Sequence, residues 1–180
     1  MKKTLFTSDT HFGHRNIIKY SNRPFKDVEE MDEALIRNWN SVVGPEDDIY
    51  HLGDFAMGKT PAPAILARLN GNKHLIWGNH DSDQVRADPL WASAQPMLEI
   101  RLDGHFIVLC HYAMKVWNKS HRGSLMFHGH SHGSLPGSDQ SCDVGVDNFG
   151  QIPVTLEQIL RRLRTYPPYH SVDHHKAREK

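Results

Sequence analysis

The sequence has few cysteines, no excess of charge of either sign and no long apolar run. Its only cysteines, Cys110 and Cys142, do not form a CxxC pair, so no disulfide framework is indicated. Its 21 basic and 21 acidic side chains balance, which argues against a general nucleic-acid-binding face. No stretch approaches the roughly 20 apolar residues of a membrane span, and Leu5-Phe6 is too short for a signal peptide core. We expect a cytoplasmic protein with no membrane partner and no sequence-specific nucleic-acid binding.

The length of 180 residues is that of one domain. A chain of this size buries roughly 70% of its unfolded surface, which is enough for a core without disulfides or structural metals. No repeat or low-complexity linker divides the chain. We predict one domain over residues 1–166 and a flexible C-terminal tail over residues 167–180, which follows the Pro167-Pro168 pair.

Helical and extended patterns alternate in the first half of the chain. Apolar residues at helical spacing predict helices over 28–43, from Thr60-Pro61 to Leu69, and from Thr155 to Pro167. Asp103-Gly104 is typical of a two-residue hairpin between antiparallel strands. Together with short apolar strands, these patterns predict an α/β domain with a mixed sheet.

Five short apolar runs are each followed by residues that can bind metal ions or transfer protons. The runs are Leu5–Thr7, Ile49–Leu52, His74–Trp77, Ile107–Cys110 and Leu125–Phe127. The residues that follow them are, in order, Asp9 and His11, then Asp54, then Asn79, His80 and Asp81, then His111, and finally His128 and His130. In α/β sheets, ligands bind beyond the carboxyl ends of the strands, so these side chains are expected to meet at one rim.

The spacing and chemistry of these residues favour a metal site. Asp9 and His11 are two residues apart, as are His128 and His130, so each pair faces one side of an extended segment. Carboxylate, imidazole and amide donors suit Mn²⁺, Fe or Zn²⁺ better than Ca²⁺. The candidates outnumber the four ligands of a single zinc ion, whereas two metals sharing one carboxylate use all of them.

The ordered blocks D-x-H, G-D, G-N-H-D, H and G-H-x-H resemble the calcineurin-like metallophosphoesterase superfamily. The resemblance covers residues 5 to about 150, with the last block taken as Gly129-His130 preceded by His128. The segments SDTHFGHRNIIKYSNRPF and VWNKSHRGSLMFHGHSHG are similar to a small bacterial and phage subgroup. The resemblance implies a four-layer α/β/β/α sandwich of two mixed sheets with a dinuclear centre. It assigns Asp9, His11 and His130 to one metal, Asn79, His111 and His128 to the other, and Asp54 to both.

These assignments predict a phosphoester hydrolase with two divalent ions, Mn²⁺ foremost and Fe, Zn²⁺ or Ni²⁺ as alternatives. A hydroxide shared by the metals attacks phosphorus in line in such sites. His80 is the candidate group for the leaving oxygen, and Asp81, which follows it, is expected to fix its tautomer. We expect a small phosphate ester or nucleotide as substrate, with a phosphodiester favoured because no inserted cap covers the site.

Substrate contacts are predicted from two loops. His14, Arg15 and Asn16 precede a short helix whose free N–H groups can face an anion, although a solvated loop is nearly as good an interpretation. Arg122 lies on a loop after His111 and is a candidate contact to the base or leaving group of a substrate. The favoured interpretation of this loop is structural, because the nearby Trp117 is expected to pack in the core. Two alternatives to a diesterase stay open. One is a phosphomonoesterase, including a phosphoprotein phosphatase. The other is an inactive scaffold of the same fold, which His80 and Asp54 argue against.

Overall fold

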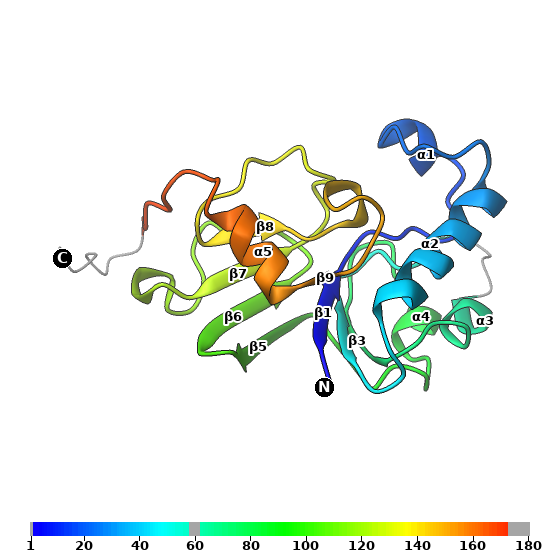
Figure 1. Ribbon diagram of the computed structural model, residues 1–180, viewed down its shortest axis with the longest axis horizontal. Helices are drawn as coiled ribbons and strands as arrows, with labels where there is room; N and C mark the ends of the chain where they lie inside the picture. Colours follow the sequence, from blue (N-terminus) through cyan, green and yellow to red (C-terminus); the bar gives the residue numbers. More distant parts are fainter. Residues whose placement is uncertain (1, 58–61, 173–180) are drawn as a thin grey trace.

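Two mixed β-sheets form the centre of the computed structural model, which describes residues 2–57 and 62–172 (Figure 1). The first sheet has the order β4-β3-β2-β1-β9, with β9 antiparallel to β1 and the other pairs parallel. Its strands are β1 (Thr4–Thr7), β2 (Asp48–His51), β3 (Asn72–Ile76), β4 (Ser93–Gln95) and β9 (Val154–Thr155). The second sheet has the order β5-β6-β7-β8, and its strands are β5 (Met97–Leu102), β6 (His105–Cys110), β7 (Leu125–His128) and β8 (Ser141–Asp143).

The antiparallel pair of the second sheet is the predicted hairpin. Asp103 and Gly104 join β5 to β6 with φ angles of 47° and 82°. Two positive φ angles characterise the two-residue turns whose twist matches that of the strands they join. Beyond this turn, β6, β7 and β8 run parallel, so the carboxyl ends of β6 and β7 lie at the same edge.

Helices lie on the first sheet and beside the second (Figure 1). The α-helices of the described part are α1 (Ile17–Tyr20), α2 (Val28–Val42), α3 (Ala62–Leu66), α4 (Asp83–Arg86) and α5 (Leu156–Leu163), and the short 3₁₀ helices are η1 (Ser120–Arg122) and η2 (Val146–Asn148). α2 begins where the carboxylate of Asp27 accepts the N–H of Glu30. Its Met31, Leu35 and Trp39 are buried against the first sheet. This helix confirms the amphipathic pattern predicted over 28–43.

A second core fills the space between the sheets. Phe6 from β1 packs edge-to-face on Phe127 from β7, with ring centroids 5.3 Å apart, and both are fully buried. α5 adds Leu156, Ile159 and Leu163 to the same core, and Thr155 and Gln158 form its capping box. Burying one such large side chain contributes roughly 1.5–3 kcal/mol to stability. The five predicted strands and the two-sheet α/β architecture are confirmed.

Several boundaries differ from the sequence prediction. β4, β8 and β9 were not predicted individually, because two or three residues show no usable periodicity. The second helix ends at Leu66 rather than at Leu69, since residues 67–69 form turns, and Thr60-Pro61 lies outside the described residues. Within the predicted tail, the ring of Tyr169 packs on Trp117, and the backbone N–H of Tyr169 donates to Asp139. Residues 173–180 lie outside the described part.

No helix within residues 2–57 and 62–172 combines the length and the apolar character that a bilayer crossing requires. Cys110 and Cys142 are both free and buried, and a buried free cysteine packs as a small apolar residue.

Candidate functional site

Loops that follow five strands bring most of the predicted ligand residues to one place. Asp9 and His11 follow β1, and Asp54 follows β2. Asn79 follows β3, and His111 follows β6 directly. The fifth loop, after β7, carries further histidines. The strands β1, β2 and β3 are parallel, as are β6 and β7, so each sheet sends its loops to one edge.

The first group of donors is formed by Asp9, His11 and His132. One donor atom of each lies within 4.8 Å of the other two. Nε2 of His11 lies 4.0 Å from Oδ1 of Asp9, and Nε2 of His132 lies 3.9 Å from the same oxygen. Asp9 and His11 are buried, and His132 is partly exposed. A carboxylate and two imidazoles are donors that Mn²⁺, Fe and Zn²⁺ accept.

The second group is formed by Asp54, His111 and His130, whose donor atoms also lie within 4.8 Å of one another. Oδ1 of Asn79 lies 3.2 Å from Nε2 of His111 and adds an amide oxygen to this group. Oδ2 of Asp54 lies 3.5 Å from Nε2 of His111 and 3.6 Å from Nε2 of His11. The carboxylate of Asp54 therefore lies between the two groups and is the group that both can share.

The loop after β7 differs from the prediction. His128 is the last residue of β7 and is buried, its Nδ1 lies 3.0 Å from the carbonyl oxygen of Gly129, and it belongs to neither donor group. His130 lies with Asp54 rather than with Asp9, and His132 lies beside Asp9, where His130 was expected. The reason is that the chain leaves the extended conformation at Gly129, so the alternation of a strand no longer applies. The G-H-x-H block read forward from Gly129 names His130 and His132, and this signal was available in the sequence.

Gly129 lets this loop approach β1 closely. A Cβ atom there would collide with Oγ of Ser8 and with the carboxylate of Asp9. Without it, the N–H of His130 donates to both carboxylate oxygens of Asp9, at 3.1 and 3.0 Å. The glycine thus brings the histidines of the loop to the aspartate from β1.

The backbone of the donor residues is strained. Five of them have φ in the left-handed region, where residues other than glycine are uncommon. They are Asp9 (56°), His11 (51°), Asp54 (57°), His130 (67°) and His132 (46°). Such residues cost on the order of 1–3 kcal/mol each and cluster at functional sites, where the surrounding structure enforces them.

The electrostatics of the groups suit cations. Burial raises the pKa of Asp9 to about 7 and lowers the pKa of His11. Both ring nitrogens of His11 are buried with no hydrogen-bond partner among the described residues. Burial also opposes ionisation of Asp54, but His111 and the N–H of His80 outweigh it and hold the pKa of Asp54 below its usual range. Unpartnered imidazole nitrogens beside buried carboxylates fit divalent cations, which would satisfy both.

Residues 2–156 match the calcineurin-like phosphoesterase superfamily domain. The chain belongs to this superfamily. The match covers every residue of both donor groups and confirms the resemblance drawn from the ordered blocks. The protein is accordingly a phosphoesterase, a hydrolase that acts on phosphate esters.

Relatives of this phosphoesterase occur in an archaeon and in a phage, and a bacterial protein shares its fold. It is 35% identical over 173 residues to an uncharacterised protein of Methanocaldococcus jannaschii, covering 91% of this chain and 92% of the relative. It is 29% identical over 189 residues to the Gene 66 protein of Mycobacterium phage L5, covering 84% of this chain and 90% of the phage protein. The crystal structure of a protein of unknown function from Aquifex aeolicus has the same fold, with a TM-score of 0.70 and 24% identity over 90% of this chain and 100% of that one.

The carboxylate of Asp81 contacts the backbone of two loops rather than the ring of His80, which it was expected to orient. This carboxylate is buried and accepts the backbone N–H groups of Asp54, Phe55 and Gly78 at 2.8–2.9 Å. It therefore ties the loop after β2 to the loop after β3, rather than orienting the ring of His80. Both loops carry donors of the second group, so this carboxylate fixes their spacing.

A buried ion pair supports the first group from behind. The guanidinium of Arg23 donates to both oxygens of Asp147, at 2.8 and 3.0 Å, and to the carbonyl oxygens of Asp9 and Thr10. Asp147 in turn lies 2.7 Å from Nδ1 of His132, which leaves Nε2 of that ring for the first group. Neither Arg23 nor Asp147 was among the site residues predicted from the sequence.

A cavity of about 650 Å³ opens over the donor groups. His14, Asn16 and His80 line it together with His11 and Asp54. Two of the predicted substrate residues, His14 and Asn16, are therefore placed at the site, and the cavity volume is within the range of small-molecule sites.

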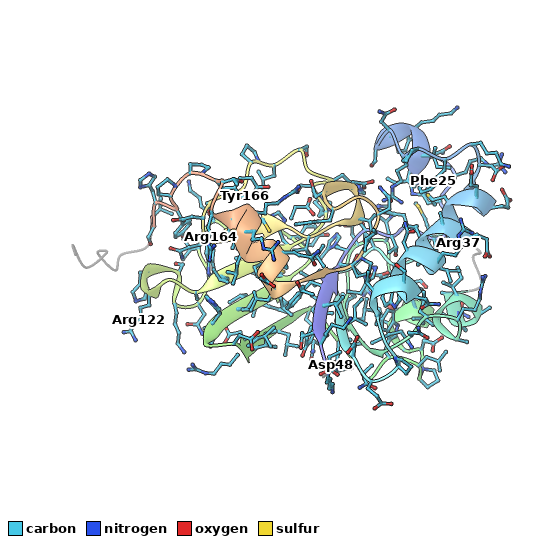
Figure 2. All side chains as sticks on the ribbon, in the orientation of Figure 1. Phe25, Arg37, Asp48, Arg122, Arg164 and Tyr166 are labelled. Atoms are coloured by element: carbon cyan, nitrogen blue, oxygen red, sulfur yellow. The ribbon has the colours of Figure 1, made fainter. Side chains whose placement is uncertain are left out.

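The other predicted substrate contacts are not brought together. Arg15 is exposed and does not line this cavity. Arg122 lies in η1, before the amino end of β7, and Figure 2 labels it at the end of the molecule opposite α1. The expected anion site on backbone N–H groups also differs: the N–H of Gly13 donates to Asp32, and that of His14 donates to His11.

Proposed function

We propose that this phosphoesterase is a dinuclear metal-dependent hydrolase that favours phosphodiester or nucleotide substrates. The observation that carries this proposal is the carboxylate of Asp54, whose Oδ2 lies about equally far from His11 of one donor group and His111 of the other, at 3.6 and 3.5 Å. One carboxylate shared by two histidine-containing groups is the arrangement that two-metal hydrolases use.

The two groups assign ligands to each ion. Asp9, His11 and His132 would hold one cation, and Asn79, His111 and His130 would hold the other, with Asp54 shared. When bound, two such ions supply positive charge toward a phosphoryl group and lower the pKa of a water molecule between them. The nitrogen and oxygen donors, without thiolate, favour Mn²⁺, with Fe, Zn²⁺ and Ni²⁺ as alternatives.

His80 is the residue of this chain best placed to serve the leaving oxygen. Its N–H donates to Oδ1 of Asp54 at 2.9 Å, which anchors the residue to the shared carboxylate. Its side chain is exposed, lines the cavity, and packs beside His11 and His14 with ring centroids 5.4 and 6.4 Å away. A histidine so held can donate a proton to the oxygen that departs from phosphorus.

Metal removal and reloading test this function. We expect chelated protein to be inactive and to regain turnover with two Mn²⁺ ions per chain, with bis-p-nitrophenyl phosphate cleaved faster than p-nitrophenyl phosphate. The measurement is a parallel assay after reloading with Mn²⁺, Fe²⁺, Zn²⁺ or Ni²⁺. Faster cleavage of the monoester would favour the phosphomonoesterase alternative. No turnover of any ester with any ion would contradict the proposal.

The two histidines of the loop after β7 give a sharp test of the ligand assignment. His132→Ala is expected to lower affinity for the first ion by roughly 100-fold or more, since it removes a direct ligand. His128→Asn keeps a polar atom near Nδ1 and is expected to bind two ions as the wild type does. Calorimetric titration of both variants with Mn²⁺ measures the difference, and a loss of metal confined to His128→Asn would reverse the assignment.

Asp147 is expected to act through His132. Asp147→Asn removes the charge that fixes the ring and leaves Arg23 with a weaker partner, so we expect Mn²⁺ affinity to fall by roughly 10–100-fold, as for other carboxylates behind metal-bound histidines. Titration with Mn²⁺ measures this change. Circular dichroism verifies that the variant is folded, and an unchanged affinity in a folded variant would show that Arg23 and Asp147 serve the fold alone.

A further inference from the structure

A second cavity, of about 380 Å³, is bordered by residues of the second donor group. His111 and Asn79 line this cavity, whereas His130 and Asp54 line the first one. Tyr112 packs beside one histidine of each cavity. Its ring centroid lies 5.0 Å from that of His111 and 4.8 Å from that of His130, and its hydroxyl donates to Oδ1 of Asn79. A phosphoryl group at the donor groups therefore has space for a substituent in each of two cavities.

The walls of the second cavity are aromatic and apolar, with one cation. Trp77, Met97 and Tyr112 line it, and Arg86 from α4 lies over the ring of Trp77, 5.4 Å from the centroid. Among the described residues, Arg86 is the only lysine or arginine that lines either cavity. This composition fits a ligand with a flat ring and a negative charge.

The guanidinium of Arg86 is held in place but is not neutralised. One Nη donates to the carbonyl oxygen of Gly78 at 3.2 Å, while Nε is buried with no hydrogen-bond partner among the described residues. The ion pair of Arg86 with Asp83 spans 3.9 Å and the Asp83 side chain is fully exposed, so this pair is weak. Arg86 thus keeps its charge and donor capacity for an anion in the cavity.

We propose that the second cavity binds the retained arm of a nucleotide diester and that Arg86 recognises a further anionic group, such as a second phosphate, on that arm. The proposal rests on the function proposed above. His80 lines the first cavity, so the leaving oxygen faces that side and the retained arm faces Trp77 and Arg86. In the hydrolysis, water adds to phosphorus, the bond to the leaving oxygen breaks, that oxygen takes a proton, and the retained arm keeps a phosphomonoester.

Matched chromogenic diesters test the subsite. The p-nitrophenyl ester of thymidine 5′-phosphate and its 3′-phosphorylated form share the leaving group and differ only in the charge of the retained arm. We expect the 3′-phosphate to raise kcat/KM by roughly tenfold with the Mn²⁺-loaded enzyme, the effect of one charge-assisted hydrogen bond. Methyl p-nitrophenyl phosphate, whose retained arm is too small to reach Arg86, measures the chemistry alone.

Variants test whether the preference for the 3′-phosphorylated diester arises in the second cavity. In Arg86→Gln the ratio of kcat/KM between the two nucleotide diesters is expected to fall to unity, while cleavage of the methyl ester is unchanged. Met97→Glu, which adds a negative charge to the same wall without touching Gly78, is expected to bring the ratio below unity. Arg164→Gln, at the exposed residue that directly follows α5 and is labelled in Figure 2, removes an equal charge outside both cavities and should keep the wild-type ratio.

Binding separates the two proposals. Thymidine 3′,5′-bisphosphate should bind the Mn²⁺-loaded protein roughly tenfold more tightly than thymidine 5′-phosphate in calorimetry, and Arg86→Gln should remove the difference. This result without turnover of any ester would support the subsite and contradict the hydrolase. Turnover with equal ratios in wild type and Arg86→Gln would contradict the subsite and leave the hydrolase standing.

Discussion

Asp54→Asn is expected to lose turnover by roughly 10³-fold or more, which corresponds to the several kcal/mol of transition-state stabilisation that a metal pair supplies. The variant keeps an oxygen or nitrogen at each position of the carboxylate but removes its charge. Both donor groups then lose the anion that lies between His11 and His111. The two cations would repel each other without it, so we expect at most one tightly bound ion per chain.

Metal analysis beside kinetics measures this outcome. Plasma mass spectrometry gives the number of ions per chain, and the diester assay gives kcat. Asp103→Asn is a matched control, because it removes one carboxylate from the hairpin between β5 and β6, where asparagine suits the positive φ of 47°. Two ions and wild-type turnover in Asp54→Asn would contradict a shared carboxylate and with it the dinuclear arrangement.

The fold could be predicted from the sequence where a pattern is long enough to repeat. The 15 residues of α2 show four turns of apolar spacing behind the Asp27 cap, and the hairpin has its two turn residues. β4, β8 and β9 are two or three residues long and exist through pairing with neighbouring strands, since so short a segment holds no pattern of its own. Their places are decided by tertiary contacts, and only coordinates reveal them.

The sequence predicted the members of the site wherever a residue's position at the end of a strand was enough to place it at the rim. Asp9, His11, Asp54, Asn79, His111 and His130 meet at one rim as expected, although His130 lies with Asp54 rather than with Asp9. The placement of His128 and His132 differs from the expectation because a strand's alternation was extended past Gly129, where the chain turns.

Residues that support the donor groups without belonging to them could not be predicted from the sequence in the same way. Arg23 and Asp147 are 124 positions apart, and nothing local indicates that they pair. Asp81 was assigned by its adjacency to His80, but its carboxylate turns away to three backbone N–H groups of the two neighbouring loops. Neighbours in sequence inside a sharply turning loop point in different directions, so adjacency was a poor guide to contact there.

His80→Ala is expected to keep both ions and to lose most turnover. The ring of His80 belongs to neither donor group, and its backbone N–H, which donates to Asp54, survives the substitution. Loss of a general acid typically costs roughly 10²–10⁴-fold, and the cost is greatest when the leaving oxygen is strongly basic. We therefore expect a large loss with a dinucleotide, whose leaving group is an alkoxide, and a small one with a p-nitrophenyl ester, whose phenolate departs without a proton.

The leaving-group dependence distinguishes proton donation from a structural role. A misplaced loop would slow both substrates by the same factor, whereas loss of the proton donor steepens the dependence of kcat on leaving-group basicity. His170→Ala, at an exposed histidine near the end of the described chain, controls for loss of an imidazole. Equal losses with both substrates, at two ions per chain, would remove His80 from the proton transfer and assign the protonation of the leaving oxygen to another group or to solvent.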